Sequence, residues 1–576
     1  MRRFSSIDFL RGTAIVLMLF LHSFMLVLDY GIIDNINNLP LITMVTLLLF
    51  PYMGAMAGFF LLVSSIGNMI SMQRHLQKGK SVKSLAIRQI MGGIILLIFA
   101  VLTEAWIGYH GAFGEAIRLN ENALEIGFYR GYHMETIHTI AWCIIINGIV
   151  QAYLSREEKW KNTNKIIKKY VILIVIIVAM TLPVWLLVNQ LVPGYPYASY
   201  SELGRGASDR IIQYPVWGET TFFEYISLFP LAAIAGHPEP IFPYLAISFL
   251  GSIIGILMSQ KRKQVPLDFP KKGMQIGFIM FLIGLVGLII TLLDVMMRVG
   301  FGAMLDTYLR LWDHRGFTPN GPANTHLFGW LFQFLCVNGA ALWVTLFIIY
   351  LVEFRGKGKK FGEKTKTVRR YGFVAFTVYN NQWIIYIAHF LVTLMFGLPI
   401  YTHMGFAGVF IVMAISFAMF QIMLILWEKV DYVGTLEWMM GTIGMHLIPA
   451  RKEAAKEGPE ELEEEACEVT RWWKEGCPNV DEAFYNAEWL NIVEESEINH
   501  KNKSESRLAF KISIIGILIF PFAILAYNIA KNSFETEEEN KYNKRARLLS
   551  IIGIIIAIFW VTLSIIFTPN MLGIAI

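Results

Sequence analysis

Residues 7–22 read Ile-Asp-Phe-Leu-Arg-Gly-Thr-Ala-Ile-Val-Leu-Met-Leu-Phe-Leu-His. Two charged residues near the start of this segment are followed directly by an apolar stretch. Asp8, Arg11 and His22 are its only ionisable residues. A helix turns by about 100° and rises about 1.5 Å per residue, so Arg11 and His22 lie within roughly 20° of each other and about 16 Å apart. If Arg11 lies at a membrane surface, His22 lies near the middle of a hydrocarbon layer about 30 Å thick. The stretch therefore predicts one helix with both side chains on a common face.

The composition is that of a membrane protein. Of 576 residues, 55% are hydrophobic and only 16% are charged, and the mean hydropathy is +0.51. Such a chain is too apolar for a soluble globular protein, and its long apolar stretches predict an all-α polytopic membrane protein. We expect a core of about ten transmembrane helices and a C-terminal hairpin of two more. The core stretches are 10–29, 41–71, 89–108, 134–154, 170–192, 241–259, 274–297, 327–352, 371–398 and 405–428, and the hairpin stretches are 508–531 and 548–568.

Lysine and arginine are concentrated in alternate loops. Loops 73–88, 155–169, 260–273 and 354–370 carry five, six, five and eight of them, whereas loops 109–132, 193–240 and 298–326 carry two, two and three. Because cytoplasmic loops are the ones rich in lysine and arginine, the pattern predicts a plasma-membrane protein with a cytoplasmic N-terminus. The small net charge of +5 and this distribution indicate topology, so no nucleic-acid partner is expected.

The four cysteines indicate neither a disulfide framework nor a zinc site, because two of them lie inside apolar stretches. The sequence therefore predicts that no metal is bound.

The chain changes character after the tenth apolar stretch. Three parts are expected: a core over residues 1–450, an acidic cytoplasmic segment over 451–507 and a membrane hairpin over 508–576. Tryptophans 472, 473 and 489 lie among polar residues of the acidic segment and would dock it on the membrane surface or on the core. Apart from Lys511 and the terminal Lys531, neither hairpin stretch holds an acidic, basic or histidine side chain, which favours an accessory anchor.

The long loop 193–240 mixes aromatic and charged side chains, among them Trp217, Arg210 and Glu219. Such a mixture suits stacking on, and hydrogen bonding to, a sugar-like ligand. An interfacial aromatic belt is the alternative reading of the same residues.

Few ionisable residues lie inside the apolar stretches. Such a group is costly in hydrocarbon unless it faces a cavity or a partner, so each is a functional candidate. Besides His22, the candidates we single out are Glu104, Glu135, His138 and His389. Glu135 and His138 are three residues apart and share a helix face, as in metal-binding bundles. No second Glu-x-x-His motif lies inside an apolar stretch, which favours a hydrogen-bonded buried pair.

His22 is the first candidate for a general base, because a neutral imidazole accepts a proton from a hydroxyl or an amine. The alternative is a histidine that only bonds to a neighbouring helix. Arg11, with Arg88 at the start of the third stretch, would hold an anionic ligand by charge-assisted hydrogen bonds. Both arginines would otherwise extend to lipid phosphates. Asp8 precedes Arg11 by three residues and is expected to orient it.

Several motifs resemble the transmembrane acyltransferase superfamily. Residues 6–12, Ser-Ile-Asp-Phe-Leu-Arg-Gly, followed by His22 resemble the opening of the acyltransferase-3 family, with the same separation of Arg and His. Residues 381–389 resemble a late helix of that family and of the heparan-α-glucosaminide N-acetyltransferases, in which Asn, Tyr and His recur as Asn381, Tyr386 and His389 do here. Residues 59–65 resemble the second helix of the superfamily, and 241–244 and 434–438 are similar to the glucosaminide-acetyltransferase and YeiB-type branches. The resemblance covers residues 1 to about 445.

The resemblance implies an acyl-CoA-dependent O- or N-acyltransferase. It would move an acyl group, expected to be acetyl, from cytoplasmic acyl-CoA to an extracytoplasmic acceptor such as a sugar of a surface glycan or glycolipid. Arg11, Arg88 and Asp8 would form the CoA end of the site. His22 would be the base, with Glu135 and His138 as further catalytic candidates and Asn381, Tyr386, His389 and Trp217 near the acceptor. A transporter or lipid-handling protein, whose buried histidines relay protons, is the competing hypothesis. The acceptor and the oligomeric state are left open.

Overall fold

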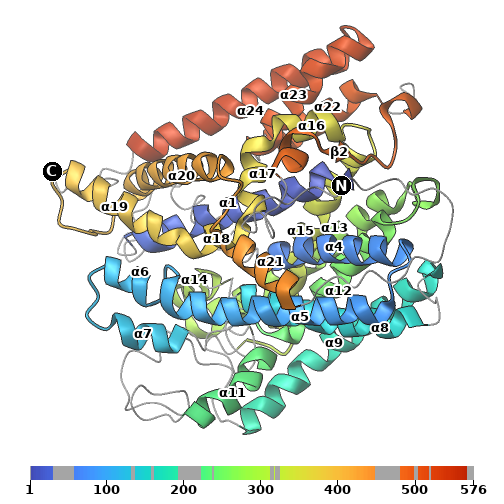
Figure 1. Ribbon diagram of the computed structural model, residues 1–576. Coiled ribbons are helices and arrows are strands. Elements are labelled where there is room, and N and C mark those ends of the chain that lie inside the picture. Colours follow the sequence, from blue (N-terminus) through green and yellow to red (C-terminus); the bar gives the residue numbers. More distant parts are fainter. Residues whose placement is uncertain are drawn as a thin grey trace. The chain divides into compact units, whose positions relative to one another are not determined.

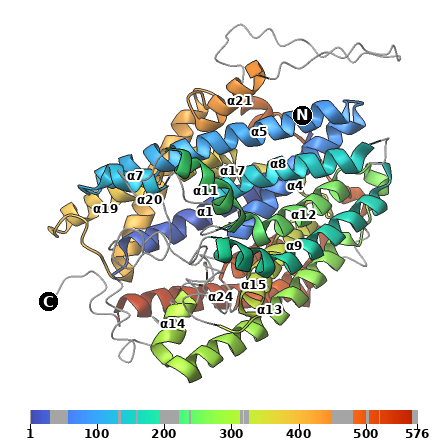
Figure 2. The ribbon, with the colours of Figure 1, turned by 90° about the horizontal axis from the view of Figure 1, so that it is seen from below.

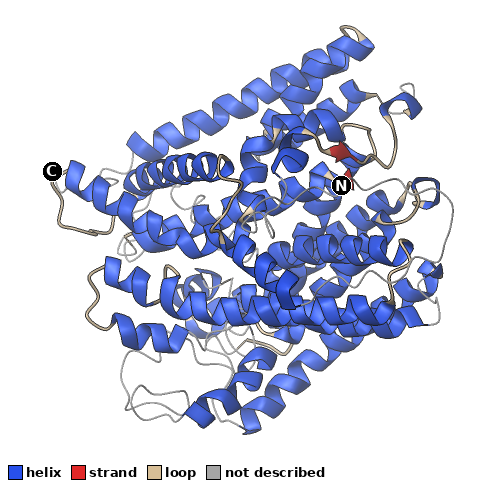
Figure 3. Ribbon diagram, in the orientation of Figure 1, coloured by secondary structure: helices blue, strands red, loops and turns tan. Residues whose placement is uncertain are grey.

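Most of the residues described by the computed structural model are helical, and the named strands are one pair of two residues each (Figure 3). The chain divides into two compact units: the first comprises Met1–His22, Phe50–Leu391 and Ala414–Ile492, and the second Ser23–Leu49, Val392–Met413 and Val493–Ile576. The described residues are 2–29, 57–130, 136–156, 161–191, 222–235, 239–309, 311, 317, 325–447, 480–498, 504–517 and 520–566.

Within these residues, eight helical stretches are long and apolar enough to cross a membrane. The chain is therefore an all-helical, multi-pass membrane protein, as the sequence predicts. The helices are α1 (Ser5–Val27), α5 (Val82–Leu102), α8 (Thr136–Ser155), α9 (Thr163–Leu191), α12 (Ile241–Met258), α13 (Phe269–Val299), α15 (Gly329–Glu353) and α20 (Phe406–Glu428). Of the stretch predicted over 41–71, the structure describes α4 (Ala57–Gln77). Shorter helices are α6 (Ala112–Ile117), α7 (Ala123–Arg130), α11 (Phe222–Ala235), α14 (Phe301–Leu309), α16 (Gly358–Lys364) and α21 (Leu436–Leu447).

In the first unit, helices α5, α8, α4, α12 and α9 pack side by side in that order (Figure 2). Glycines allow the backbones to come close: a Cβ on Gly93 of α5 would lie 2.5 Å from the Ile145 side chain of α8. Helices α13 and α15 form a second close pair (Figure 1), in which a Cβ on Gly284 would lie 2.1 Å from the backbone nitrogen of Cys336. Small residues thus set the helix contacts, as is usual where lipid supplies no hydrophobic driving force between helices.

The stretch predicted as one helix over 371–398 is broken, so that prediction was wrong. The chain forms α17 (Lys366–Phe373), α18 (Ala375–Asn380), a 3₁₀ turn over Asn381–Trp383 and α19 (Ile384–Met395). The first break is at Val374, whose φ of −122° and ψ of 50° are not helical. Apolar composition alone does not reveal such a break, because each piece is as apolar as a continuous helix.

Part of the acidic segment belongs to the first unit. Residues 480–492, here called the strap, run along the ends of several helices. Strand β2 (Glu488–Trp489) pairs in parallel with β1 (Arg2–Arg3), and Ile492 N–H donates to the Glu353 carbonyl at 2.9 Å. The Arg369 guanidinium lies 4.7 Å from the Trp489 ring. Docking of Trp489 on the core is thereby confirmed, whereas Trp472 and Trp473 lie outside the described residues.

In the second unit the predicted helix over 508–531 is two helices, α22 (Glu505–Gly516) and α23 (Phe520–Glu537), followed by α24 (Lys541–Ile566). The single-helix prediction was therefore wrong. At about 1.5 Å per residue, α22 spans only about 18 Å, which is less than a hydrocarbon layer about 30 Å thick. The side chain of Glu537 accepts bonds from Ser504 Oγ at 2.7 Å and from Ser506 N–H at 3.3 Å, which ties the end of α23 to the start of α22. The three helices pack through buried alanines, Ala509, Ala530 and Ala546.

Candidate active site

Arg11 and His22 lie on one continuous helix, α1 (Ser5–Val27), as predicted. The helix consists largely of apolar residues and has one acidic residue, Asp8, in its first turn, where a carboxylate favours the positive end of the helix dipole. His22 is half-buried. The predicted spacing of about 16 Å between the two residues follows from the continuity of the helix.

Gln382 and Tyr109 are two of the side chains that contact His22. Its Nδ1 lies 2.6 Å from Oε1 of Gln382, and its Nε2 lies 3.4 Å from the hydroxyl oxygen of Tyr109. The His22 and Tyr109 rings pack with their centroids 4.9 Å apart, and His110 packs on Tyr109 at 3.8 Å. The histidine therefore lies where α1, the turn after α5 and the broken helix meet.

The amide of Gln382 assigns the tautomer of His22. Gln382 is fully buried, and its Nε2 donates a hydrogen bond of 2.8 Å to the carbonyl of Tyr379. The amide oxygen then faces His22, so Nδ1 carries the ring proton and donates it. Nε2 keeps its lone pair and faces Tyr109. In this tautomer the imidazole accepts a proton at Nε2, which is what a general base requires.

Tyr109 is placed by a widened turn at the end of α5. Residues Thr103–Ile107 form a π-helical turn, and Gly108 N–H bonds to the Thr103 carbonyl at 2.5 Å. A Cβ on Gly114 would lie 2.1 Å from the carbonyl oxygen of Tyr109, so only glycine leaves Tyr109 where it is. Turns of this kind are frequent at functional sites. Glu104, singled out in the sequence, is buried in this turn.

Gln382 is placed by Glu437, a residue of α21. The Glu437 carboxylate accepts hydrogen bonds from Phe376 N–H at 2.6 Å and from the Thr377 hydroxyl at 2.5 Å, at the start of α18. It thus caps the helix that begins after the break at Val374 and meets the positive end of that helix. Burial raises the pKa of Glu437, and the bonds from Thr377 and Phe376 oppose that rise. The cap holds α18 and, beyond it, the turn that carries Gln382.

We expect Glu437→Ala to lower activity and stability together, because it leaves buried donors at the start of α18 without an acceptor. Each unsatisfied donor costs about 1–3 kcal/mol. Glu437→Gln is the matched control: its amide oxygen can still accept the backbone N–H groups of Phe376 and Thr377, which both bond to one carboxylate oxygen in the wild type, so it should stay much closer to wild type. The thermal midpoint and turnover of both variants in detergent check this. Equal loss in the two variants would show that charge, rather than capping, is what matters.

Arg11 is the unpaired cation of α1. Its Nη2 would lie 2.9 Å from a Cβ added to Gly67 of α4, so that glycine leaves room for the guanidinium. Among the described residues Arg11 has no hydrogen-bond or ion-pair partner. A guanidinium so placed has its donors free for an anionic ligand.

Asp8 does not orient Arg11, and that expectation was wrong. Both Asp8 oxygens bind Arg3, at 2.9 Å from Nε and 3.0 Å from Nη2. Arg3 lies in strand β1, just before the first turn of α1, and is therefore close to Asp8. Its guanidinium donates two parallel hydrogen bonds to the carboxylate. The Asp8 carboxylate therefore binds the guanidinium of Arg3, and the guanidinium of Arg11 remains available for an anionic ligand.

The N-terminal end of α1 is fixed by close backbone contacts. Glu353, fully buried at the end of α15, accepts bonds from Ser6 N–H at 3.1 Å and Ser6 Oγ at 2.7 Å. One turn after Asp8, a Cβ on Gly12 would lie only 2.0 Å from the carbonyl oxygen of Val368 in α17. Glycine at position 12 is therefore what lets α1 and α17 touch.

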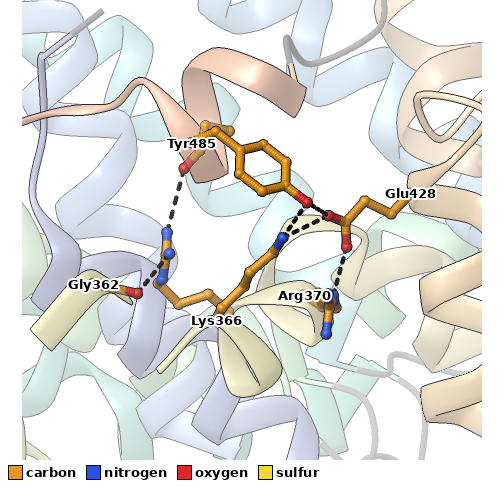
Figure 4. Close-up of polar contacts among 7 residues, drawn as sticks. Gly362, Lys366, Arg370, Glu428 and Tyr485 are labelled. Atoms are coloured by element: carbon orange, nitrogen blue, oxygen red, sulfur yellow. Dashed lines mark hydrogen bonds and ion pairs between the residues drawn. The ribbon is translucent and has the colours of Figure 1, made fainter. Parts of the chain in front are cut away.

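Glu428, at the end of α20, joins α17 to the strap (Figure 4). Its carboxylate lies 2.8 Å from Lys366 Nζ and 2.6 Å from Arg370 Nε, and it accepts a bond of 2.8 Å from the Tyr485 hydroxyl. Beside it, Arg369 donates to the Gly362 carbonyl at 2.7 Å. Burial lowers the pKa of Arg369 to about 10, so the group stays charged near neutral pH. These cations bind protein groups, in contrast to Arg11.

The other predicted site residues have different surroundings. Arg88 is exposed on α5. His138 is fully buried on α8, and neither ring nitrogen has a hydrogen-bond partner in the part of the chain that the structure covers. Asn381 donates its side-chain amide to the Thr377 carbonyl at 2.9 Å, a bond within its own chain segment. Tyr386 and His389 are buried on α19.

Arg118 lies over the Tyr386 ring at 5.3 Å and pairs with Glu115 at 3.3 Å, which joins α6 to α19. Glu135 and Trp217 lie outside the described residues. In the described ranges no group of three or more His, Cys, Asp or Glu side chains could hold a metal ion.

Sequence reasoning missed Gln382, Tyr109 and Glu437 as site residues. Gln382 and Glu437 lie inside motifs that carry the family resemblance, and Gln382 directly follows the predicted Asn381. The available signal for Gln382 was an amide side chain inside a predicted spanning stretch. Tyr109 had no such signal, because a tyrosine at the end of an apolar stretch is typical of a membrane interface.

Neither the models of known protein families nor the curated proteins include a match to this chain.

Proposed function

We propose that the protein is a membrane acyltransferase that moves an acyl group, expected to be acetyl, from acyl-CoA to an acceptor hydroxyl or amine. The observation that carries the proposal is the setting of His22: Gln382 fixes its tautomer, and Nε2 lies 3.4 Å from the Tyr109 hydroxyl. With the ring proton on Nδ1, Nε2 is the basic nitrogen that a general base requires. The resemblance of residues 6–12 and 381–389 to transmembrane acyltransferases supports the same chemistry.

In the proposed reaction His22 takes the proton of the acceptor at Nε2 while the acceptor oxygen or nitrogen attacks the thioester carbonyl carbon. The carbon–sulfur bond then breaks, and the CoA thiolate takes the proton back from Nε2, so no proton is gained or lost overall. Because the Tyr109 hydroxyl lies 3.4 Å from Nε2, it is near enough to donate to the carbonyl oxygen as negative charge develops there. A transient acyl-histidine is not required by this geometry.

Arg11 would bind the phosphates of CoA, since its guanidinium has no partner within the described residues. The lysine- and arginine-rich loops support a cytoplasmic N-terminus in a plasma membrane, which would put Arg11 on the side where CoA is found. The acceptor would then reach His22 from the opposite side, as a sugar of a surface glycan or glycolipid. The finer topology we propose is a ten-helix core with an accessory C-terminal membrane element.

The proposal is tested with purified protein and CoA. We expect millimolar CoA to raise the thermal midpoint and acetyl-CoA to be turned over slowly, because water can replace the acceptor. Arg11→Ala should weaken CoA binding by about ten- to a hundred-fold, as expected for loss of hydrogen bonds to a charged group. Arg298→Ala removes an exposed arginine that pairs with Asp294 and is the matched control. Absence of any CoA effect at millimolar concentration would overturn the enzyme proposal.

A transporter is the second candidate, favoured by His138. This residue is fully buried on a membrane-crossing helix and its ring nitrogens have no bonded partner among the described residues, as expected for a proton-relay group. The transporter hypothesis predicts substrate flux into vesicles without acyl-CoA turnover. The CoA experiment therefore separates the two hypotheses.

A further inference from the structure

A groove of about 600 Å³ lies between α5, α8 and α9, away from the contacts of His22. Its apolar walls include Ile90 of α5, Ile149 and Tyr153 of α8, and Ile172 of α9. Three of these side chains are more exposed than covered, at 52% for Ile149, 62% for Tyr153 and 57% for Ile172. On membrane-crossing helices such exposed apolar walls face lipid, so the groove is open to acyl chains.

Two cations, Arg156 and Lys169, complete the lining. Arg156 directly follows the last residue of α8, and Lys169 lies in the second turn of α9. Both therefore belong to the helix ends joined by the 155–169 loop, at the boundary between hydrocarbon and water. This placement holds whichever side of the membrane the loop faces.

Neither cation pairs with an acidic side chain among the residues that the structure describes. Arg156 lies 5.1 Å from the centroid of the Tyr153 ring, and neither Arg156 nor Lys169 has an acidic partner within the described ranges. Lys366 and Arg370, by contrast, share the Glu428 carboxylate. Two unpaired cations at the headgroup level of an apolar groove attract a phosphate that is attached to acyl chains.

We propose that this groove is a binding site for an anionic phospholipid. Its phosphate would lie between Arg156 and Lys169, and one acyl chain would lie along Ile149, Tyr153 and Ile172. A zwitterionic lipid fits the apolar walls equally well but brings its own positive charge to the two cations. The site therefore selects on headgroup charge, and it is independent of the proposed acyl transfer.

The test uses the full chain in neutral detergent, with retained lipid counted by native mass spectrometry and binding followed by thermal shift. Phosphatidylglycerol should bind more tightly than phosphatidylcholine with the same chains. The double variant Arg156→Gln, Lys169→Gln should lose about thirty-fold in affinity for phosphatidylglycerol, about five-fold for each charge near the surface. The matched control is Lys165→Gln, Lys168→Gln, which removes two exposed charges from the same helix that do not line the groove.

A second variant tests the apolar part. Ala152 lines the groove, so Ala152→Phe should fill it and reduce lipid retention with both cations in place. Inorganic phosphate at matched concentration should give no thermal shift, because it lacks the acyl chain. Equal binding of the two lipids would overturn the proposal. So would an equal loss in the control pair, or a shift produced by phosphate alone.

Discussion

His22→Ala is expected to lose acyl transfer by about 10²- to 10⁴-fold while it keeps the thermal stabilisation by CoA. The reason is that Nε2 is the proton acceptor, whereas the proposed CoA contact is at Arg11, about 16 Å away along the same helix. Deletion of the imidazole removes the base and leaves the guanidinium in place. The measurements are acetyl transfer or slow acetyl-CoA hydrolysis for chemistry, and the CoA-dependent thermal midpoint for binding.

His446→Ala is the matched control, because His446 is an exposed histidine on α21 whose hydrogen bond among the described residues is to the Thr442 carbonyl of its own helix. It should behave as wild type in both assays. If His22→Ala kept transfer, the base would have to be another residue. If it lost CoA stabilisation and transfer together with a lowered midpoint in the absence of CoA, His22 would be a packing residue.

The second large effect is expected from a single methyl group. Gly12→Ala should destabilise the first unit by about 3 kcal/mol, at the upper end of overpacking costs. The added Cβ would lie 2.0 Å from the carbonyl oxygen of Val368, which is backbone and cannot rotate away. The contact is mutual, since a Cβ on Gly372 would lie 2.6 Å from Gly12 N. α1 and α17 would have to separate, and the N-terminal part of α1 that carries Arg11 would move with them.

Gly92→Ala provides the comparison, because nothing lies within 4 Å of a Cβ at that position of α5. Alanine favours helix over glycine by about 1 kcal/mol, so this variant should be as stable as wild type or slightly more so. Thermal unfolding followed by loss of monodisperse protein in detergent distinguishes them. Equal midpoints for the two variants would mean that α1 and α17 do not touch as described.

Much of the membrane architecture is predictable from composition and length. Long apolar stretches need no partner to be recognised, because a spanning helix satisfies its own backbone hydrogen bonds. The predictions failed where the backbone bonds are satisfied by distant residues. The helix expected over 371–398 breaks at Val374 because Glu437, 61 residues from Phe376, accepts the N–H groups that the break exposes. In the second unit, the bonds from Ser504 and Ser506 to Glu537 hold together the two helices that replace 508–531.

The sequence by itself determined that Arg11 and His22 share one face of α1, since that relation depends only on the pitch of a helix. Only the tertiary structure decided which side chains contact each of these two residues. Gln382 is 360 residues from His22 and Tyr109 is 87 residues away, and Asp8 binds Arg3 rather than Arg11. Such partners depend on how helices are rotated and brought together by Gly12, Gly114 and the Glu437 cap. Apolar periodicity does not encode those rotations, because lipid and protein neighbours favour the same residues on a helix surface.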